Sequence, residues 1–277
     1  MNLEELKSMA GDIRVDIVKM VAEAGSGHPG GSLSAADIMC ALYFGGVLKH
    51  DAENPKAEDR DRFLLSKGHA APALYATLAE AGYFPKEELA TLRKLHSRLQ
   101  GHPDCRKLPG VEASTGSLGQ GLSIAAGMAL GLKLNGSESS VFTLMGDGEC
   151  QEGQVWEAAM FAAHKGLDNL VAIVDHNHLQ IDGRIETVCS PEDLGDKFRS
   201  FGWQVLQCDG NDMEAILATL ESAKESRSGK PCVIVAETTK GKGVSFMEDQ
   251  AGWHGKAPNA EQTEQALAEL TANKEAK

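Results

Sequence analysis

An aspartate and an asparagine, each close behind a short apolar run, are the first candidates for chemistry in this sequence of 277 residues. Asp147 lies in Gly146-Asp147-Gly148, and Asn177 follows it after 30 residues, enough for one turn, one crossover helix and a return strand. Both side chains would then lie at the carboxyl edge of two parallel strands, where α/β sheets bind ligands. A carboxylate and an amide oxygen suit a magnesium ion that also takes phosphate oxygens. The same residue types are ordinary turn formers, so a plain turn remains open at this point.

Histidines beside glycines form a second candidate group. Four of the nine histidines adjoin a glycine, namely His28, His69, His102 and His254. Loops held on a rigid scaffold often bear binding and catalytic residues, so these four are candidates for hydrogen bonding to a ligand. The others are predicted to be surface or packing residues: His50, His96, His164, His176 and His178.

Apolar patterns predict the elements that must position these residues. Before Gly136, helices separated by glycine-rich loops are predicted at 3–24, from the capping box Ser34–Asp37 onward, and at 71–81, 86–96 and 118–134. After it, apolar runs at 141–145, 170–174, 204–207 and 232–236 alternate with helical windows at 153–165, 192–201 and 212–227. This alternation is typical of a parallel sheet with helices on both faces. We therefore predict an α/β fold with a helical N-terminal part, as one domain over 1–277, whose tail at 259–277 is a solvated terminal helix or a frayed end.

Composition restricts the partners and the location. The 27 Lys and Arg against 40 Asp and Glu give a formal charge of −13, which argues against nucleic acid and anionic membranes as partners. No stretch is apolar and long enough to span a bilayer, and the charged N-terminus does not fit a signal peptide. The six cysteines contain no CxxC pair, so we expect reduced thiols in a cytoplasmic protein. The 30 glycines exceed the usual share, which favours loops that bring backbone close to a ligand.

Longer segments resemble the transketolases, a family of thiamine diphosphate enzymes. The segment that begins at Gly146 resembles the family's thiamine diphosphate motif, which starts with GDG and ends with an asparagine at this spacing. Within this segment, the short motifs QEG, E-A-A and D-x-N-x-x-x-I-D-G resemble transketolases specifically. Four further segments resemble the family in the same order: SGHPGGSLSAADIM (26–39), SKGHAAPALYATL (66–78), GHPD (101–104) with ASTGSLGQGLSIAAGMALG (113–131), and TKGKGVSFMEDQAGWHG (239–255). The resemblance implies the N-terminal, diphosphate-binding domain of the family, with a thiamine diphosphate-binding fold.

The same resemblance implies a role for each candidate residue. Asp147, Asn177 and the backbone carbonyl of Leu179 would hold Mg2+, for which Ca2+ or Mn2+ could substitute. His69, His254 and Lys240 would lie near the diphosphate of the cofactor. His28, His102 and His254 would act as catalytic hydrogen-bond donors around the sugar carbonyl and hydroxyls. The other cofactor-binding positions would be Gly31, Gly116, Ser117, Leu118, Gly148 and Glu152, the last within a network that joins the two halves of the dimer.

Three nearby residues receive plainer predictions. For Asp175 and His176, a role at the end of a strand is as open as a functional one. Lys67 could meet a phosphate, but a solvated lysine is the preferred interpretation.

The carboxylate that activates thiamine diphosphate has no counterpart here. In transketolases a glutamate on a second, pyrimidine-binding domain polarises the pyrimidine ring. The sequence ends at Lys277, so the pyrimidine-binding and C-terminal domains are expected to be absent and supplied by a separate C-terminal subunit, with two copies of each chain in a heterotetramer. Such an enzyme moves a two-carbon ketol unit from a ketose phosphate donor to an aldose phosphate acceptor, as in the pentose phosphate pathway. The surface left for the partner is expected to be apolar beside the loops 27–31, 68–71 and 116–121.

Three alternatives remain open. The chain could belong to a split thiamine-dependent ketol transferase of an unusual sugar or sulfosugar pathway, because the donor-specificity residues would lie mostly on the other subunit. It could be a non-catalytic partner that only binds the cofactor, although such a relic would have no use for sugar-facing histidines. It could also be a truncated piece of a longer chain.

Overall fold

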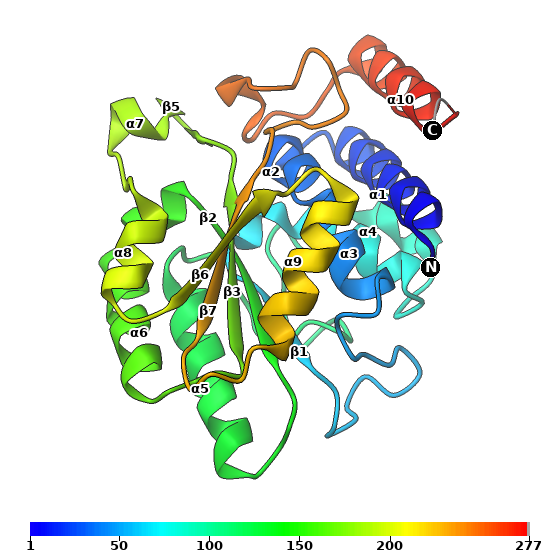
Figure 1. Ribbon diagram of the computed structural model, residues 1–277. Coiled ribbons are helices and arrows are strands. Elements are labelled where there is room, and N and C mark those ends of the chain that lie inside the picture. The colour runs from blue at the N-terminus through cyan, green and yellow to red at the C-terminus, as the bar shows by residue number, and fades with distance from the viewer. Residues whose placement is uncertain (276–277) are drawn as a thin grey trace.

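Five parallel strands form the central sheet of the computed structural model, which describes residues 1–275 (Figure 1). The order across the sheet is β1-β2-β3-β7-β6, and every neighbouring pair is parallel. The strands are β1 (Arg62–Leu65), β2 (Val141–Gly146), β3 (Leu170–His176), β6 (Gln204–Asp209) and β7 (Cys232–Glu237). The predicted α/β class is confirmed, and β1 is a strand that the apolar patterns missed. A separate antiparallel ribbon follows β3 and consists of β4 (Leu179–Gln180) and β5 (Gly183–Arg184).

Helices cover both faces of the sheet, as the sequence predicts. One face packs against α1 (Leu3–Ala24), α3 (Ala36–Phe44), α4 (Ala71–Glu80) and α9 (Met213–Glu225); the other packs against α5 (Gln120–Leu134), α6 (Gly153–His164) and α8 (Leu194–Ser200). Alternate side chains of one strand serve the two faces, with Phe142 and Leu144 in the first core and Val141 and Met145 in the second. Burial on both faces explains why the strands are continuous apolar runs. Over residues 1–275, no helix is long and apolar enough to cross a membrane.

The last helix, α10 (Ala260–Glu275), packs against α1 at the edge of the fold (Figure 1). Its Ala266 and Leu270 are buried in the first core. The described part of the tail is therefore a helix anchored by a short apolar stripe, not a fully solvated or frayed end.

Two predictions in the N-terminal part are wrong. The helix expected over 86–96 is only a 3-10 segment, η2 (Lys86–Thr91), because Arg93 and His96 adopt left-handed φ angles of 59° and 66° that end helical geometry. The helix predicted from Ser34–Asp37 onward is present as α3, which begins at Ala36, but the capping box does not form, since α2 (Pro29–Ser34) runs through Ser34 and α3 has no side-chain cap. The Ser34 hydroxyl instead donates to the Asp175 carboxylate at 2.6 Å.

Several of the segments that bear the candidate residues follow the strands at one edge of the sheet. Because all five strands are parallel, their carboxyl ends meet at this edge. The short elements after β1, β2, β3 and β7 are η1 (Gly68–Ala70), η3 (Gly148–Gln151), α7 (Ile185–Val188) and η4 (Ala251–Trp253). This edge is where the candidate site must be sought.

Candidate functional site

Asp147 and Asn177 lie at the ends of adjacent strands, as their spacing predicts. Asp147 follows β2, and its two carboxylate oxygens accept the backbone N–H groups of Gly148 at 2.7 Å and His178 at 2.6 Å. The second bond joins the loop after β2 to the loop after β3. Asn177 follows β3, and its side-chain oxygen accepts the N–H of Leu179 at 3.2 Å. Both residues line one cavity of about 210 Å³ at the sheet edge.

The charges around the buried Asp147 carboxyl group do not compensate its own charge. The residue is only 2% exposed, and burial together with the nearby Asp175 carboxylate raises its pKa to about 6, against the two backbone N–H groups that lower it. A carboxylate in this condition gains from a neighbouring positive charge. Because the oxygens of Asp147 and Asn177 face the same cavity, a divalent cation is the fitting charge.

Lys67 is buried, which corrects the prediction of a solvated lysine. It is 1% exposed and forms an ion pair with Asp175, which is fully buried at the end of β3. Its ammonium group also donates to the carbonyl oxygen of Gly31 at 2.7 Å. Burial raises the pKa of Asp175, but Lys67 and the hydroxyls of Ser34 and Thr238 outweigh burial and hold that pKa below its usual value. Asp175 thus connects four segments beneath the cavity.

Lys240 extends into the cavity from the loop after β7. It is 2% exposed, and its ammonium group donates to the carbonyl oxygen of Leu179 and to Nδ1 of His254, both at 3.0 Å. Burial lowers the Lys240 pKa to about 8. The carbonyl predicted as a metal ligand and the lysine predicted near the diphosphate are therefore direct neighbours.

The four glycine-flanked histidines converge from four separate segments. The ring centre of His28 lies 5.3 Å from that of His69, 5.4 Å from that of His254 and 6.5 Å from that of His102, and the His69 and His254 rings are 5.0 Å apart. His28 precedes α2, and His69 lies in η1. His102 follows η2, and His254 follows η4. The sequence placed them on loops, and the fold brings them into one group beside the cavity.

These imidazole rings are held in the neutral form at neutral pH. Burial, and then the charge of Arg93, lowers the pKa of His28 to about 4. Burial and Lys240 lower the pKa of His254 to about 3, and burial lowers that of His69 well below its usual value. Burial and Arg93 also lower the pKa of His102. Each neutral ring has one nitrogen that donates and one that accepts, which suits a ligand with several hydroxyl groups.

Glu149 shapes the glycine loop before α5, a role that the sequence did not reveal. Its carboxylate accepts the N–H groups of Gly119 at 2.9 Å and Gly146 at 3.1 Å and the hydroxyl of Ser66. Burial raises the Glu149 pKa. A buried carboxylate surrounded by three donors thus fixes the backbone of two loops that border the cavity.

The predicted residues differ in how directly they face the cavity. Those that line it are Gly31, His69, Leu118, Asp147, Gly148, Glu152, Asn177, Leu179, Lys240 and His254. Gly116 lies beside them with a φ of 137°, and a Cβ there would stand 2.9 Å from the His102 ring. Ser117 and Glu152 are exposed at the rim. Two larger hollows, of about 910 and 710 Å³, lie against α1 and α10 and include none of these side chains.

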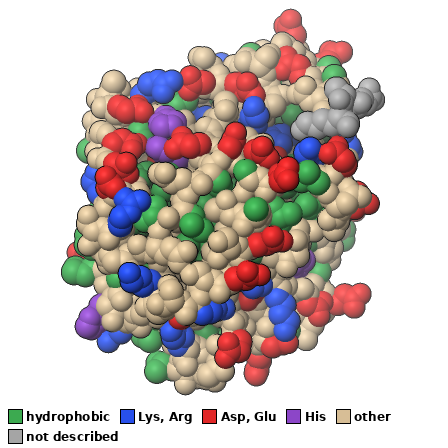
Figure 2. All heavy atoms as spheres, in the orientation of Figure 1, with side chains coloured by type: hydrophobic (Ala, Val, Ile, Leu, Met, Phe, Trp, Pro, Cys, Tyr) green, Lys and Arg blue, Asp and Glu red, His purple; other side chains and the backbone are tan. Residues whose placement is uncertain are grey.

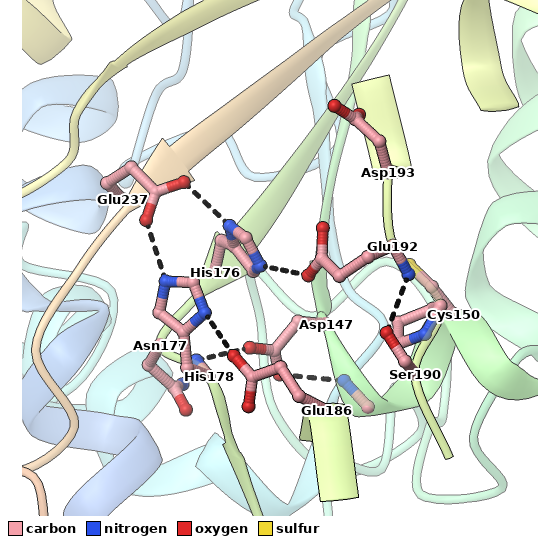
Figure 3. Close-up of polar contacts among 12 residues, drawn as sticks. Asp147, Cys150, His176, Asn177, His178, Glu186, Ser190, Glu192, Asp193 and Glu237 are labelled. Carbon is pink, nitrogen blue, oxygen red and sulfur yellow. Dashed lines mark hydrogen bonds and ion pairs between the residues drawn. The ribbon is translucent and has the colours of Figure 1, made fainter. Parts of the chain in front are cut away.

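The five remaining histidines divide into two kinds. His96 and His164 are exposed, and His50 bonds to the carbonyl of Tyr43 at 2.9 Å, so these three fit the prediction. His176 and His178 instead meet Glu237 in a polar cluster (Figure 3), which the prediction of plain surface or packing roles missed.

The expected apolar surface beside the loops is present in part. Among the described residues, Ile181 is 68% exposed and lines the same cavity as Leu118, whereas the loops 27–31, 68–71 and 116–121 themselves contain none of the large exposed apolar side chains. The loops present His69 and Leu118 to the cavity and Ser117 to solvent.

Comparison with known sequences identifies relatives across the whole chain. A family profile described as "Transketolase, thiamine diphosphate binding domain" matches residues 6–277. The chain is 45% identical over 266 residues to a subunit of the 6-deoxy-6-sulfo-D-fructose transketolase of a Clostridium species, covering 96% of each. It is 44% identical over 271 residues to a subunit of the apulose-4-phosphate transketolase of Phocaeicola vulgatus, covering 98% of this chain and 95% of that one.

Solved structures give the same result for the fold. The transketolase of Campylobacter jejuni superposes with a TM-score of 0.91 at 37% identity, over 98% of this chain and 43% of that one. The transketolase of Pichia stipitis in complex with sedoheptulose 7-phosphate superposes with a TM-score of 0.89 at 32% identity, over 99% and 44%. The chain thus spans less than half the length of these solved transketolases. The chain belongs to the transketolase family, and it corresponds to the family's thiamine diphosphate-binding domain.

Proposed function

We propose that this chain is the N-terminal subunit of a two-subunit transketolase. It transfers a two-carbon ketol unit from a ketose donor to an aldose acceptor with thiamine diphosphate and Mg2+. The observation that supports this most strongly is one cavity lined by Asp147 and Asn177 at two strand ends and by His69 and His254, whose rings lie next to that of His28. The oxygens suit a metal-bound diphosphate, and the histidines suit a polyhydroxylated sugar.

The donor atoms fit a magnesium ion. Asp147 contributes a buried carboxylate, Asn177 an amide oxygen and Leu179 a backbone carbonyl, and all three residues line the cavity. Mg2+ prefers oxygen ligands and keeps positions for phosphate oxygens. The raised pKa of Asp147 supports the same assignment, because burial outweighs every group that stabilises the charge of this carboxylate.

The cationic and hydrogen-bonding groups around these oxygens fit a diphosphate. Lys240 and His69 line the same cavity, and His254 is bonded to Lys240. Gly31 and Gly148 leave room there for phosphate oxygens. Gly116, Ser117 and Leu118 would contact the rings of the cofactor, and exposed Glu152 would face the dimer network.

Bound thiamine diphosphate supplies the nucleophilic carbon that accepts the ketol unit. The task of this chain's residues is to hold the sugar and stabilise its oxygen. His28, His102 and His254 would donate hydrogen bonds to the carbonyl oxygen as negative charge develops on it. Because their rings start neutral, each can give a proton at one nitrogen and take one at the other.

The pyrimidine-activating glutamate is proposed to come from a C-terminal subunit. Residues 1–277 would form one diphosphate-binding domain, and two copies of each chain would close into a heterotetramer. Two relatives that this chain matches over almost their full length are named as transketolase subunits, which supports this arrangement. All six cysteines are free thiols, which supports a cytoplasmic location.

The sugar is the open part of the proposal. Donors and acceptors of the pentose phosphate type are one candidate. An unusual sugar or a sulfosugar is the second, and it is favoured by relatives named for 6-deoxy-6-sulfo-D-fructose and apulose 4-phosphate.

Replacement of Asp147 by Ala tests the cofactor assignment. The variant should lose magnesium-dependent binding of thiamine diphosphate, measured by calorimetry, while its circular dichroism spectrum is unchanged. Asp12→Ala, at a half-buried position on α1 that does not line the cavity, is the matched control and should bind normally. Unchanged affinity in Asp147→Ala would refute the assignment.

A further inference from the structure

A second group of potential metal ligands lies beside the candidate magnesium site (Figure 3). His176, His178 and Glu237 each offer one ligand atom, and these atoms all lie within 4.8 Å of one another. We propose that these three residues bind a borderline divalent metal ion such as Zn2+, at a site separate from the oxygen site of Asp147. This inference does not depend on the proposed transketolase activity.

The strands hold two of the ligands on a rigid frame. His176 is the last residue of β3 and Glu237 the last residue of β7, and the two are direct partners in the parallel register. Glu237 reaches both rings, with one oxygen 2.7 Å from Nδ1 of His176 and the other 2.9 Å from Nε2 of His178. Ligands of one tetrahedral zinc ion stand roughly 3.3 Å apart. This spacing lies between the two contacts of Glu237 and the 4.8 Å within which all three ligand atoms lie, so modest shifts of the side chains would admit the ion.

The third ligand is brought in by the backbone just beyond β3. His178 has a φ of 62°, in the left-handed region that non-glycine residues seldom adopt. This turn lets its ring approach that of His176, and the ring centres lie 4.0 Å apart. Two imidazoles and a carboxylate are the donor set of many three-ligand zinc sites, with a water in the fourth position.

Each histidine also has the outer partner that metal-binding histidines usually have. The nitrogen of His176 that points away from Glu237 bonds to Glu192 at 2.9 Å, and that of His178 bonds to Glu186 at 3.2 Å. Such carboxylates orient the ring and fix which nitrogen faces the metal. Three carboxylates around two imidazoles also make the site attractive to a cation.

A solvated ion can reach this cluster. The side chains of His178 and Glu237 are 33% and 53% exposed, whereas that of His176 is 6% exposed at the base. In Figure 2 histidine side chains bordered by acidic ones reach the surface at the upper left, in the region of β5 and α7. The oxygen-only donors at Asp147 suit Mg2+, and the imidazoles here suit Zn2+, so the two sites differ in metal preference.

Zinc titration of the chelator-treated full chain tests the proposal. Calorimetry with Zn2+ in excess Mg2+ should give one site, and Co2+ should give the intense visible absorption of a low-coordinate nitrogen and oxygen site. His178→Ala and Glu237→Gln should each weaken Zn2+ binding at least tenfold, and Glu192→Gln should weaken it by about tenfold or more. The side chains of His178 and Glu237 are partly exposed, so neither substitution should disturb the core. If one variant nevertheless fails to fold, the other still tests the proposal.

Matched controls separate this site from the rest of the molecule. His164→Ala removes an exposed histidine of α6, and His96→Ala removes an exposed histidine after η2; both should keep the zinc affinity of the natural chain. Absence of zinc binding in the natural chain would overturn the proposal. Zinc affinity in His178→Ala and Glu237→Gln equal to that of the natural chain would also overturn it, as would a loss in His164→Ala or His96→Ala of the same size as in the ligand variants.

Discussion

Replacement of Lys67 by Met should destabilise the chain and loosen the candidate site together. Lys67 and Asp175 are 1% and 0% exposed, so the substitution would leave a carboxylate buried without its cation. Removal of one partner of a buried pair costs about 3–5 kcal/mol. Asp175 would keep the Ser34 hydroxyl at 2.6 Å and the Asn177 amide at 3.2 Å, so we expect the lower end, about 3 kcal/mol.

Urea unfolding monitored by circular dichroism measures this loss directly. The exposed pair Lys49–Asp59, with side chains 60% and 76% exposed, provides the control, and Lys49→Met should leave the free energy of unfolding nearly unchanged. The double variant Lys67→Met/Asp175→Asn should recover part of the stability, because no buried charge remains. A loss in Lys67→Met no larger than in Lys49→Met would refute the argument that this ion pair anchors the cavity.

Three further predictions concern the histidines and their loops. In the complete two-subunit enzyme, His102→Ala or His254→Ala should lower the rate of ketol transfer by roughly two to four orders of magnitude, whereas exposed His96→Ala should be near neutral; equal losses at His96 and His102 would contradict the assignment. In proton NMR of the isolated folded chain, His28 should stay neutral until about pH 4. Because the unfolded chain takes up this proton at about pH 6.5, His28 should lower the free energy of unfolding as the pH falls from about 6.5 to about 4. Protonation of His28 near pH 6.5 in the folded chain would argue against its burial. Gly116→Ala should displace the His102 ring, 2.9 Å from the new Cβ, and lower ketol transfer, whereas Gly127→Ala in α5 meets nothing within 4 Å and should leave the rate unchanged; equal rates in the two variants would show that the ring can move freely.

The local sequence was sufficient to predict the position of a residue where that position depends only on the residue's own strand or loop. The interval between Asp147 and Asn177 predicted two adjacent parallel strands, since one crossover helix fills it, and β2, α6 and β3 have this arrangement. It was insufficient at β1, where a four-residue strand begins with Arg62 after a polar loop and has no apolar run long enough to stand out.

Long-range pairing accounts for the other failures. Lys67 lies in the short polar segment Ser66–His69, which does not indicate burial. The burial of Lys67 depends on its ion pair with Asp175, which is 108 residues away in the chain. The cluster at His176 depends on the register between β3 and β7, which no local pattern contains. The helix predicted over 86–96 fits the apolar spacing, but Arg93 turns into the left-handed region, where its guanidinium bonds to Ser26 at 2.8 Å. Tertiary contacts override helical spacing at this point.

Reconstitution of activity tests the central claim most directly. The chain and its cognate C-terminal partner are purified separately, and transfer from a ketose phosphate to an aldose phosphate is measured with Mg2+ and thiamine diphosphate, for each chain alone and for the mixture. We predict no turnover by either chain alone, and turnover together with a complex of two copies of each chain in the mixture. Substantial turnover by this chain alone, at a purity that excludes the partner, would contradict the account.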